Sequence, residues 1–478
     1  MSMVPARNHL RESSRTTSLA CAVIVLAVLA VYYNSLSCPF IFDDSSAVVT
    51  NPSIHKFESA LSPSPYKLVG GRPVLNFTFA LNYALGGLDV RGYHALNLLV
   101  HALAGLTLFG LLRRTLLRPV RQAPRLARGL ELVETAQGYG GQALTSRLAA
   151  RRSEISDLRF EIGADATPLA LAVAVIWTVH PLQTEAVTYI SERAESLMGL
   201  FYLLTLYGFV RGASATGERP AASGEWSEDT TPVFNSQLST LSSGLWFAGS
   251  VLACLLGVFS KEVVVTAPVM VLLYDRTFVA GSFCEAWRLR WRYYLGLAGT
   301  WLPLGWSMMS LDRRGIGFDQ GVAWWSYALT SCRSLVLYLK LAIWPHPLVF
   351  DYGTAVVQHA TEVAPYMLIL AGLVAATAIA LWRWPAAGFA GAWFFVILAP
   401  ASSVIPVAGQ PMAEHRMYLS LAAVVTLGVL GLYAWLGRRS LMVLVAAAMG
   451  LGWLTIQRNK DYRSNLAILS DTVEKCPD

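Results

Sequence analysis

Two adjacent carboxylates, Asp43 and Asp44, follow the first long apolar run of the sequence by about ten residues. Neighbouring carboxylates repel each other, which raises the pKa of one of them. At a membrane surface, such a pair is suited to take a proton from an acceptor hydroxyl group or to hold a cation. The other interpretation is structural, with the acids capping a turn ahead of Asn51 and Pro52. The spacing leaves both interpretations open.

Side chains suited to bind a phosphate lie in other polar segments between apolar runs. Arginine offers two parallel hydrogen bonds to a phosphate, and other cationic side chains add positive charge. The sequence predicts that one set of such side chains surrounds a phosphate group: Arg72, Arg193, Lys261, His415 and Arg416. Together with the acidic pair, this set indicates transfer of a group from a lipid-linked phosphate donor.

Acidic residues accompany several of these cations. Glu185, Glu192 and Arg193 lie in one polar segment, where they could form a structural clamp or contact a substrate. Lys261 and Glu262 lie in a tight turn between two apolar runs. Charged groups at membrane depth are costly unless they are paired or hydrated. We therefore expect Lys261 and Glu262 to face a watered cavity.

Histidines are the remaining candidates, and we expect them to support the site. His94, Asn97 and His101 share one face of a helix, because they are three and four residues apart. Polar groups that face the interior of a bundle in lipid are commonly functional. No carboxylate lies at a matching spacing, so hydrogen bonding between helices is favoured over a metal site. His180 begins the polar segment that contains Glu185.

The elements that must position these residues are membrane helices. Of 478 residues, 55% are hydrophobic and only 14% are charged, whereas an average soluble domain has roughly 25% charged residues. This composition excludes a soluble protein. The net charge of +7 does not indicate nucleic-acid binding, because the arginines gather between apolar runs as in cytoplasmic loops. Six cysteines without a CxxC pair support neither a zinc site nor a disulfide scaffold.

A helix needs about 20 apolar residues to cross the hydrocarbon core of a bilayer. The sequence therefore predicts an all-α polytopic membrane protein with about eleven spans: Leu19–Tyr33, His94–Leu112, Pro168–Val179, Ser196–Val210, Leu245–Phe259, Val263–Val279, Tyr293–Met309, Val363–Trp382, Ala387–Val404, Tyr418–Leu436 and Leu441–Ile456. The stretch Ala323–Trp344 is apolar too, but Arg333 and Lys340 would each cost about 2.5 to 3.5 kcal/mol at a helix centre. We expect an interfacial or re-entrant element there.

The arginines also predict the orientation, because positive residues gather on the inner side of a membrane. The N-terminus then lies inside, and the segments that hold the acids and the candidate phosphate ligands share the outer side. The predicted organisation is a cytoplasmic leader at 1–18, a transmembrane domain at 19–456 with a first outer loop at 34–72 and cytoplasmic loops at 113–167 and 211–243, and an outer tail at 457–478.

Several motifs, in order along residues 19–478, resemble the transmembrane O-mannosyltransferases that target cadherins. They are Phe-Asp-Asp at 42–44 with Asn51-Pro52, Arg72-Pro73, Tyr93-His94 with Asn97 and His101, His180-Pro181 through Glu185 to Arg193, Ser260-Lys261-Glu262, Leu348 to Tyr352, and Glu414 to Leu419. That family is similar to the C-type glycosyltransferases, which are multi-span enzymes that use polyprenyl-phosphate sugars on the outer or lumenal face.

The resemblance implies that the protein moves a sugar, expected to be mannose, from polyprenyl phosphate to a hydroxyl of an acceptor protein or glycan. Asp43 or Asp44 would be the catalytic base, and the first acid of such a pair is preferred. Arg193, Lys261 and Arg416 would neutralise the departing phosphate. No metal and no other cofactor is expected. The implied location is a bacterial inner membrane, or the endoplasmic reticulum membrane in a eukaryote.

Two alternatives to a transferase stay open. A flippase or transporter of lipid-linked sugars would use the same cavity, but transporters commonly contain internal repeats, and none is found between residues 19–210 and 245–456. The second alternative is a non-catalytic membrane anchor of a repeat protein. This alternative does not explain why the acids and the cations share the outer side of the membrane. Members of the family continue into tetratricopeptide repeats of about 34 residues, whereas residues 457–478 resemble only the lead-in to a first repeat.

Overall fold

The computed structural model of the protein describes residues 4–62, 71–118, 161–215, 233–309, 323–402 and 409–476. These residues form helices joined by turns, and the part described contains no β-strand. The all-α class predicted from the sequence is therefore confirmed. Large parts of the two predicted cytoplasmic loops, 119–160 and 216–232, lie outside the described residues.

Six described stretches are long and apolar enough to cross a membrane: Arg15–Ser37, Val90–Leu116, Arg193–Ala215, Leu241–Val258, Ala360–Arg383 and Glu414–Arg463. A seventh is a pair of helices, Ala166–Val179 and Pro181–Thr188, that meet at a bend of 56°. These stretches confirm a polytopic membrane protein. The number of about eleven spans stays a prediction.

Several predicted spans are shorter or broken in the structure. The span at 263–279 consists of η5 (Glu262–Thr266) and α11 (Ala267–Phe278), and the one at 293–309 is divided between α12 (Phe283–Gly299) and α13 (Trp301–Met309). α16 (Pro385–Leu398) is a short apolar helix. The stretch Glu414–Arg463, in contrast, holds two long helices, α17 (Met417–Leu436) and α18 (Ser440–Arg458). The expected interfacial element forms the helix α14 (Trp324–Ile343).

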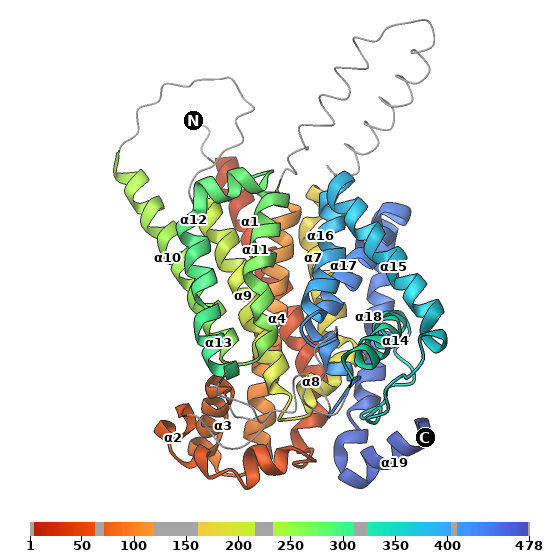
Figure 1. Cartoon of the computed structure of the whole chain (residues 1–478). Helices are drawn as coiled ribbons and strands as arrows, with labels where there is room; N and C mark the ends of the chain where they lie inside the picture. The colour runs from red at the N-terminus through yellow and green to blue at the C-terminus, as the bar shows by residue number, and fades with distance from the viewer. Residues whose placement is uncertain are drawn as a thin grey trace, which may run out of the picture.

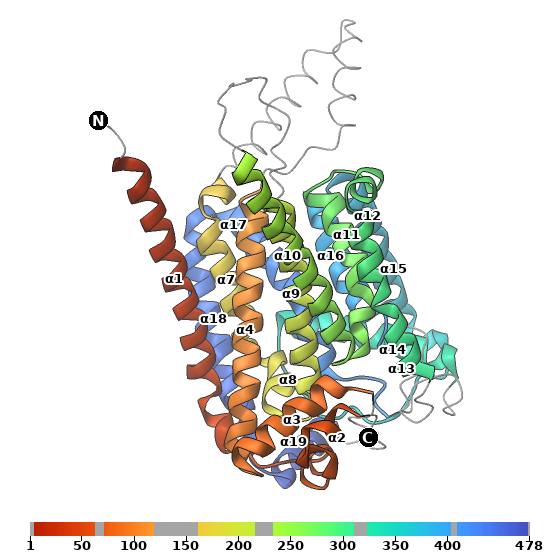
Figure 2. The same ribbon diagram turned by 90° about the vertical axis from the view of Figure 1, so that its left-hand side faces the viewer.

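The centre of the bundle is α7 (Ala166–Val179), which packs against four helices: α1 (Val4–Tyr32), α4 (Val90–Leu116), α17 and α18. Its sequence is apolar on all sides, as expected for a helix without a solvent-exposed face. α9 (Arg193–Ala215) packs on α4 and on α10 (Val233–Val258), and α15 (Ala360–Arg383) packs on α16 (Figures 1 and 2). A Cβ atom at Gly199 of α9 would overlap the ring of Tyr418, so glycine permits the close approach of α9 and α17.

The connections at one end of the bundle carry the predicted site residues (Figures 1 and 2). The segment between α1 and α4 contains η1 (Tyr33–Ser37), η2 (Ser45–Val49), η3 (Pro52–His55), α2 (Phe57–Leu61) and α3 (Pro73–Gly86). Beside it lie η4 (Pro181–Gln183), α8 (Thr184–Thr188), η5, η6 (Glu414–Arg416), η8 (Asp461–Arg463) and α19 (Asn465–Lys475). The arginine-containing turn η7 (Gly437–Arg439) lies at the opposite end. Which end faces outward stays a prediction.

Candidate active site

The two carboxylates of the acidic pair have different surroundings. Asp44 is 1% exposed; its Oδ1 accepts a hydrogen bond from the backbone N–H of Ser191 at 2.7 Å, and its Oδ2 accepts one from that of Ile41 at 3.1 Å. Asp44 thus joins the first loop to the segment that follows α8. Asp43 is exposed, and no described residue donates a hydrogen bond to its carboxylate. Asp43 is therefore the acid of the pair that a molecule from solution can reach.

Both carboxyl groups hold their protons more strongly than an ordinary aspartate. Burial raises the pKa of Asp44 to about 7, even though the hydrogen bonds from Ile41 and Ser191 oppose this shift. Partial burial and the nearby charge of Glu192 raise the pKa of Asp43. A raised pKa makes Asp43 a stronger base near neutral pH than a fully hydrated aspartate.

The backbone that carries Asp43 is held from three sides. Phe42 has φ of +42°, a left-handed conformation that is strained for an aromatic residue and persists only where its surroundings enforce it. The N–H of Phe42 donates to Oδ1 of Asn465 at 3.2 Å, and its ring stacks on Phe350 with centroids 4.9 Å apart. The N–H of Asp43 donates to the hydroxyl of Tyr189 at 3.0 Å. The tail, the segment after α14 and the segment after α8 together position Asp43.

The predicted phosphate ligands Lys261 and His415 lie together, each beside buried acids. Nζ of Lys261 is 2.8 Å from Oε1 of Glu195 and 3.5 Å from Oε2 of Glu192. Nδ1 of His415 is 2.7 Å from Oε1 of Glu185, and its Nε2 is 3.8 Å from Oε2 of Glu192. Glu185 lies in α8, His415 in η6 and Glu195 in the first turn of α9, while Lys261 directly precedes η5 and Glu192 directly precedes α9. The bundle thus brings four distant segments into one ionic network.

Arg72 lies beside this network: its Nη2 is 3.1 Å from Oε1 of Glu262, and its charge interacts with Glu192 and Glu195. Burial alone would favour the neutral form of Glu192, but His415, Lys261 and Arg72 together lower its pKa to about 2. Burial disfavours the charged form of Lys261 as well, yet Glu192 and Glu195 raise the pKa of its ammonium group. Glu192 and Lys261 therefore both favour their charged forms, because each lies beside charges of the opposite sign.

Arg193 is fully buried and makes its hydrogen bonds to other protein groups. Its Nε donates to Oδ1 of Asn97 at 2.5 Å, and its Nη1 donates to Oδ1 of Asn82 at 2.8 Å and to Oγ1 of Thr78 at 3.1 Å. Its Nη2 donates to the carbonyl oxygen of Tyr93 at 2.9 Å. Arg193 thus connects α9 to α3 and α4, and the structure does not bring it into the network around Lys261.

Arg416 is also occupied by protein groups. Its Nη1 donates to the carbonyl oxygens of Ala401 at 2.8 Å and Pro411 at 3.0 Å, and its Nη2 donates to that of Gln410. The guanidinium group therefore holds Ala401 next to residues 410–411, which shortly precede η6. A role of Arg193 or Arg416 in neutralising a phosphate stays a prediction, and Arg72, Lys261 and His415 are the candidate ligands that lie in one network.

The histidines at helical spacing join separate elements by hydrogen bonds. Nε2 of His94 is 2.9 Å from the carbonyl oxygen of Cys38. His101 is 3.0 Å from the carbonyl oxygen of Thr178 through Nε2, and 2.9 Å from the hydroxyl of Tyr418 through Nδ1. A carbonyl only accepts, so the proton of His101 is on Nε2, and the Tyr418 hydroxyl donates to Nδ1. These contacts agree with the helix-to-helix hydrogen bonding favoured above.

Two further buried groups fix the segment after α14. Oε1 of Glu414 accepts hydrogen bonds from the N–H of Val349 at 2.7 Å and from the hydroxyl of Tyr352 at 2.8 Å. Nε2 of His180 donates to the carbonyl oxygen of Ala342 at 3.2 Å. These bonds bring residues 348–352, which include Phe350, beside the acidic pair.

Three residues of the site, Glu195, Tyr189 and Asn465, were not predicted from the sequence. Glu195 lies one helical turn from Glu192, a spacing that could have been noticed. Tyr189 lies within the same polar segment as Glu185, but only the folded loop shows that its hydroxyl meets the backbone of Asp43. No local pattern marks Asn465, which is separated from Phe42 by 423 positions.

One group of side chains in the described part has the composition of a metal site. Ligand atoms of Glu192, Glu195 and His415 all lie within 4.8 Å of one another. The ammonium group of Lys261 is already in contact with both glutamates. A lysine in this place supplies the positive charge that a divalent ion would otherwise bring, and it would repel such an ion.

Acidification is expected to stabilise the protein through Asp44. Its pKa is about 7 in the folded protein against an ordinary value of 3.8, so this group's contribution is complete below pH 3.8 and is lost as the pH rises to about 7. The melting temperature of purified protein should therefore increase from pH 8 to pH 5. Asp44→Asn should flatten this increase. If the melting temperature of that variant depends on pH as in the wild type, Asp44 is not the group responsible.

Part of the chain is similar in sequence to known proteins. The protein is 27% identical over 222 residues to protein O-mannosyl-transferase Tmtc3 of Drosophila melanogaster, which is 44% of this chain and 21% of that protein. It is 26% identical over 230 residues to TMTC3 of Mus musculus and 28% over 200 residues to TMTC2 of Homo sapiens, both named protein O-mannosyl-transferases.

The matches to Tmtc3 of Drosophila melanogaster and to mouse TMTC3 cover about a fifth of the length of those relatives. No protein-family model matches the chain, and no solved structure matches it. The resemblance predicted from the motifs is nevertheless confirmed, because relatives along more than 40% of this chain carry the name of that family.

Proposed function

We propose that the protein is a membrane glycosyltransferase that moves a sugar, mannose, from a polyprenyl-phosphate donor to a hydroxyl group of an acceptor protein or glycan. The observation that carries the proposal is that the exposed Asp43 carboxylate lies close enough to Glu192 for their charges to interact, and Glu192 belongs to the ionic network of Lys261 and His415. The names of the relatives support the transferase class and the sugar.

In the proposed reaction, Asp43 takes the proton of the acceptor hydroxyl while the hydroxyl oxygen forms a bond to the anomeric carbon of the sugar. The bond between this carbon and the phosphate oxygen breaks, and polyprenyl phosphate leaves with the electron pair. Arg72, Lys261 and His415 stabilise the charge that develops on the leaving oxygen, because buried cations act strongly where water is excluded. When the donor binds, these three cations give up part of their contact with Glu262, Glu192 and Glu185 and contact the phosphate instead.

The proposed reaction runs without a bound metal, because Lys261 already supplies positive charge between Glu192 and Glu195. It takes place on the outer or lumenal face, in a bacterial inner membrane or in the endoplasmic reticulum membrane of a eukaryote. The lipid-linked donor then reaches the site from the outer leaflet, and the acceptor reaches Asp43 from the aqueous side.

The experiment that tests this function uses purified full-length protein in nanodiscs with radiolabelled polyprenyl-phosphate mannose and a panel of hydroxyl acceptors. We expect labelled acceptor to form, and we expect the rate to be unchanged when EDTA is added. In sealed proteoliposomes, movement of the labelled donor between leaflets without transfer would favour the flippase. Transfer that EDTA abolishes and Mn²⁺ or Mg²⁺ restores would support the transferase but contradict the metal-free reaction.

A further inference from the structure

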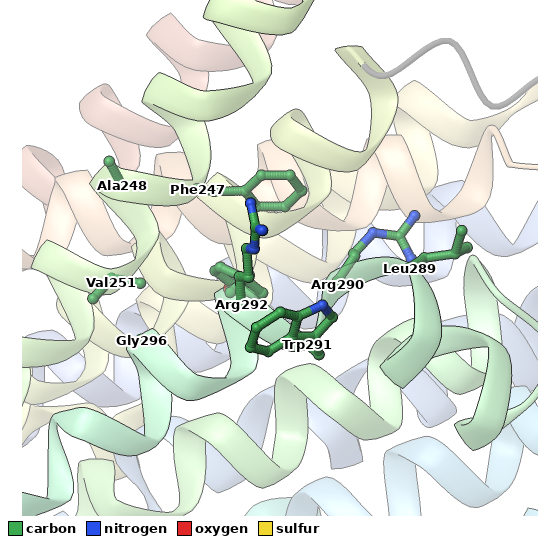
Figure 3. Close-up of a pocket in the computed structure, with 9 residues that line it drawn as sticks. Phe247, Ala248, Val251, Leu289, Arg290, Trp291, Arg292 and Gly296 are labelled. Atoms are coloured by element: carbon green, nitrogen blue, oxygen red, sulfur yellow. The ribbon is translucent and has the colours of Figure 1, made fainter.

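A cavity of about 560 Å³ opens between α10 and α12, towards the end of the bundle opposite to the candidate active site (Figure 3). Phe247 and Val251 of α10 and Gly296 of α12 form its apolar part. A Cβ atom at Gly296 would lie 3.4 Å from Val251, so the missing side chain keeps this part open. The apolar part has the chemistry to hold a hydrocarbon chain.

Two arginines of α12 border this cavity and differ in their partners. α12 is kinked at Arg290, whose Nη1 lies 3.0 and 3.1 Å from the two carboxylate oxygens of the buried Asp275. Arg292 is exposed, and no described acidic side chain pairs with it; its guanidinium lies 5.4 Å from the ring centre of Trp291. Figure 3 shows the side chain of Arg292 extending from α12 towards Phe247. Arg292 therefore places a positive charge without an acidic partner beside an apolar cavity.

The surroundings of the cavity have the character of the lipid headgroup region. Trp287 and Trp291 of α12 are 50% and 44% exposed, and tryptophan is enriched where a membrane meets water. The same end of the bundle holds the last turn of α4 with Arg113 and Arg114, and the turn η7 with Arg438 and Arg439. Such a surface attracts anionic lipids, and the attraction grows with each positive residue.

We propose that this cavity is a binding site for an anionic phospholipid. Arg292 donates hydrogen bonds to the phosphate, and one acyl chain lies along Phe247, Val251 and Gly296. A zwitterionic lipid would bring its own cationic group among the arginines, so a lipid with net negative charge is favoured. The site is separate from Asp43 and does not depend on the proposed transferase activity.

Native mass spectrometry of the full-length protein tests the site, with phosphatidylglycerol and phosphatidylcholine added to delipidated protein in detergent. We expect wild-type protein to retain phosphatidylglycerol preferentially, and Arg292→Gln to weaken this retention by about tenfold, the effect of one charged hydrogen bond. Gly296→Leu should fill the apolar part and reduce the binding of both lipids.

Arg288→Gln is the matched control, because Arg288 lies on the same helix, is 75% exposed at its side chain and pairs with Glu285 outside the cavity. This variant should retain phosphatidylglycerol as the wild type does. An equal loss of phosphatidylglycerol in Arg288→Gln and Arg292→Gln would mean that the lipid binds to general positive surface charge, which would overturn the proposal. Unchanged retention in Arg292→Gln or Gly296→Leu would overturn it as well. Displacement of the lipid by millimolar inorganic phosphate would also overturn it, as the cavity would then bind free phosphate. Melting temperatures of all variants verify that they are folded.

Discussion

Asp43→Asn is expected to lower the rate of sugar transfer by about 10²- to 10⁴-fold, the usual contribution of a general base. The amide cannot take the proton of the acceptor hydroxyl, although it fills nearly the same space. Because the Asp43 side chain is exposed and accepts no hydrogen bond from a described residue, the variant should melt at the wild-type temperature. Transfer assays and thermal unfolding of the same preparation measure both properties.

Asp44→Asn is the matched comparison, since it makes the same chemical change one residue away. The Asp44 carboxylate accepts two backbone hydrogen bonds in a buried place, and an asparagine amide group would put a donor where one of them is accepted. We expect a lower melting temperature together with partial loss of activity. Activity that survives in Asp43→Asn but disappears in a stable Asp44→Asn protein would assign the base to Asp44.

The acidic pair illustrates how far the sequence could lead. The sequence predicted that Asp43 and Asp44 lie just beyond the end of the first span. A helix of fixed length crosses the membrane, so polar residues that shortly follow an apolar run lie at the membrane surface. It could not distinguish the two acids, because their environments depend on contacts with Ser191 and Tyr189, both more than 140 residues away. The strained backbone of Phe42 depends likewise on Asn465 and Phe350.

The cations show the corresponding limit for charge. The sequence correctly indicates where positive residues lie along the chain, but it does not reveal which hydrogen-bond acceptors they meet. Arg193 follows Glu192 directly, yet these neighbours point into different environments, since Glu192 meets Lys261 and Arg193 meets Asn82 and Asn97. Helix α9 begins between them, and successive residues on a helix face about 100° apart. The sequence therefore predicted one phosphate site of five cations, whereas in the structure only some of these cations lie together.

Arg193→Met is expected to destabilise the protein by about 3 to 5 kcal/mol, because each buried acceptor that loses its donor costs about 1 to 3 kcal/mol. The substitution leaves the buried side-chain oxygens of Asn82 and Asn97 and the carbonyl of Tyr93 without their donor. It also removes a guanidinium group that lies 4.8 Å from the ring centre of Phe79. Thermal unfolding in detergent, followed by intrinsic fluorescence, should show a markedly lower melting temperature.

Arg193→Lys distinguishes this structural role from binding of the donor phosphate. A lysine keeps the positive charge, but its single ammonium group cannot reproduce the planar set of donors that reaches Asn97, Asn82 and Tyr93 together. A structural Arg193 therefore predicts low stability in both variants, with the donor KM of the folded fraction close to that of the wild type. A phosphate ligand predicts the opposite, namely stable variants in which Arg193→Met greatly raises the donor KM and Arg193→Lys largely restores it. The four acceptors around the guanidinium in the structure favour the first outcome.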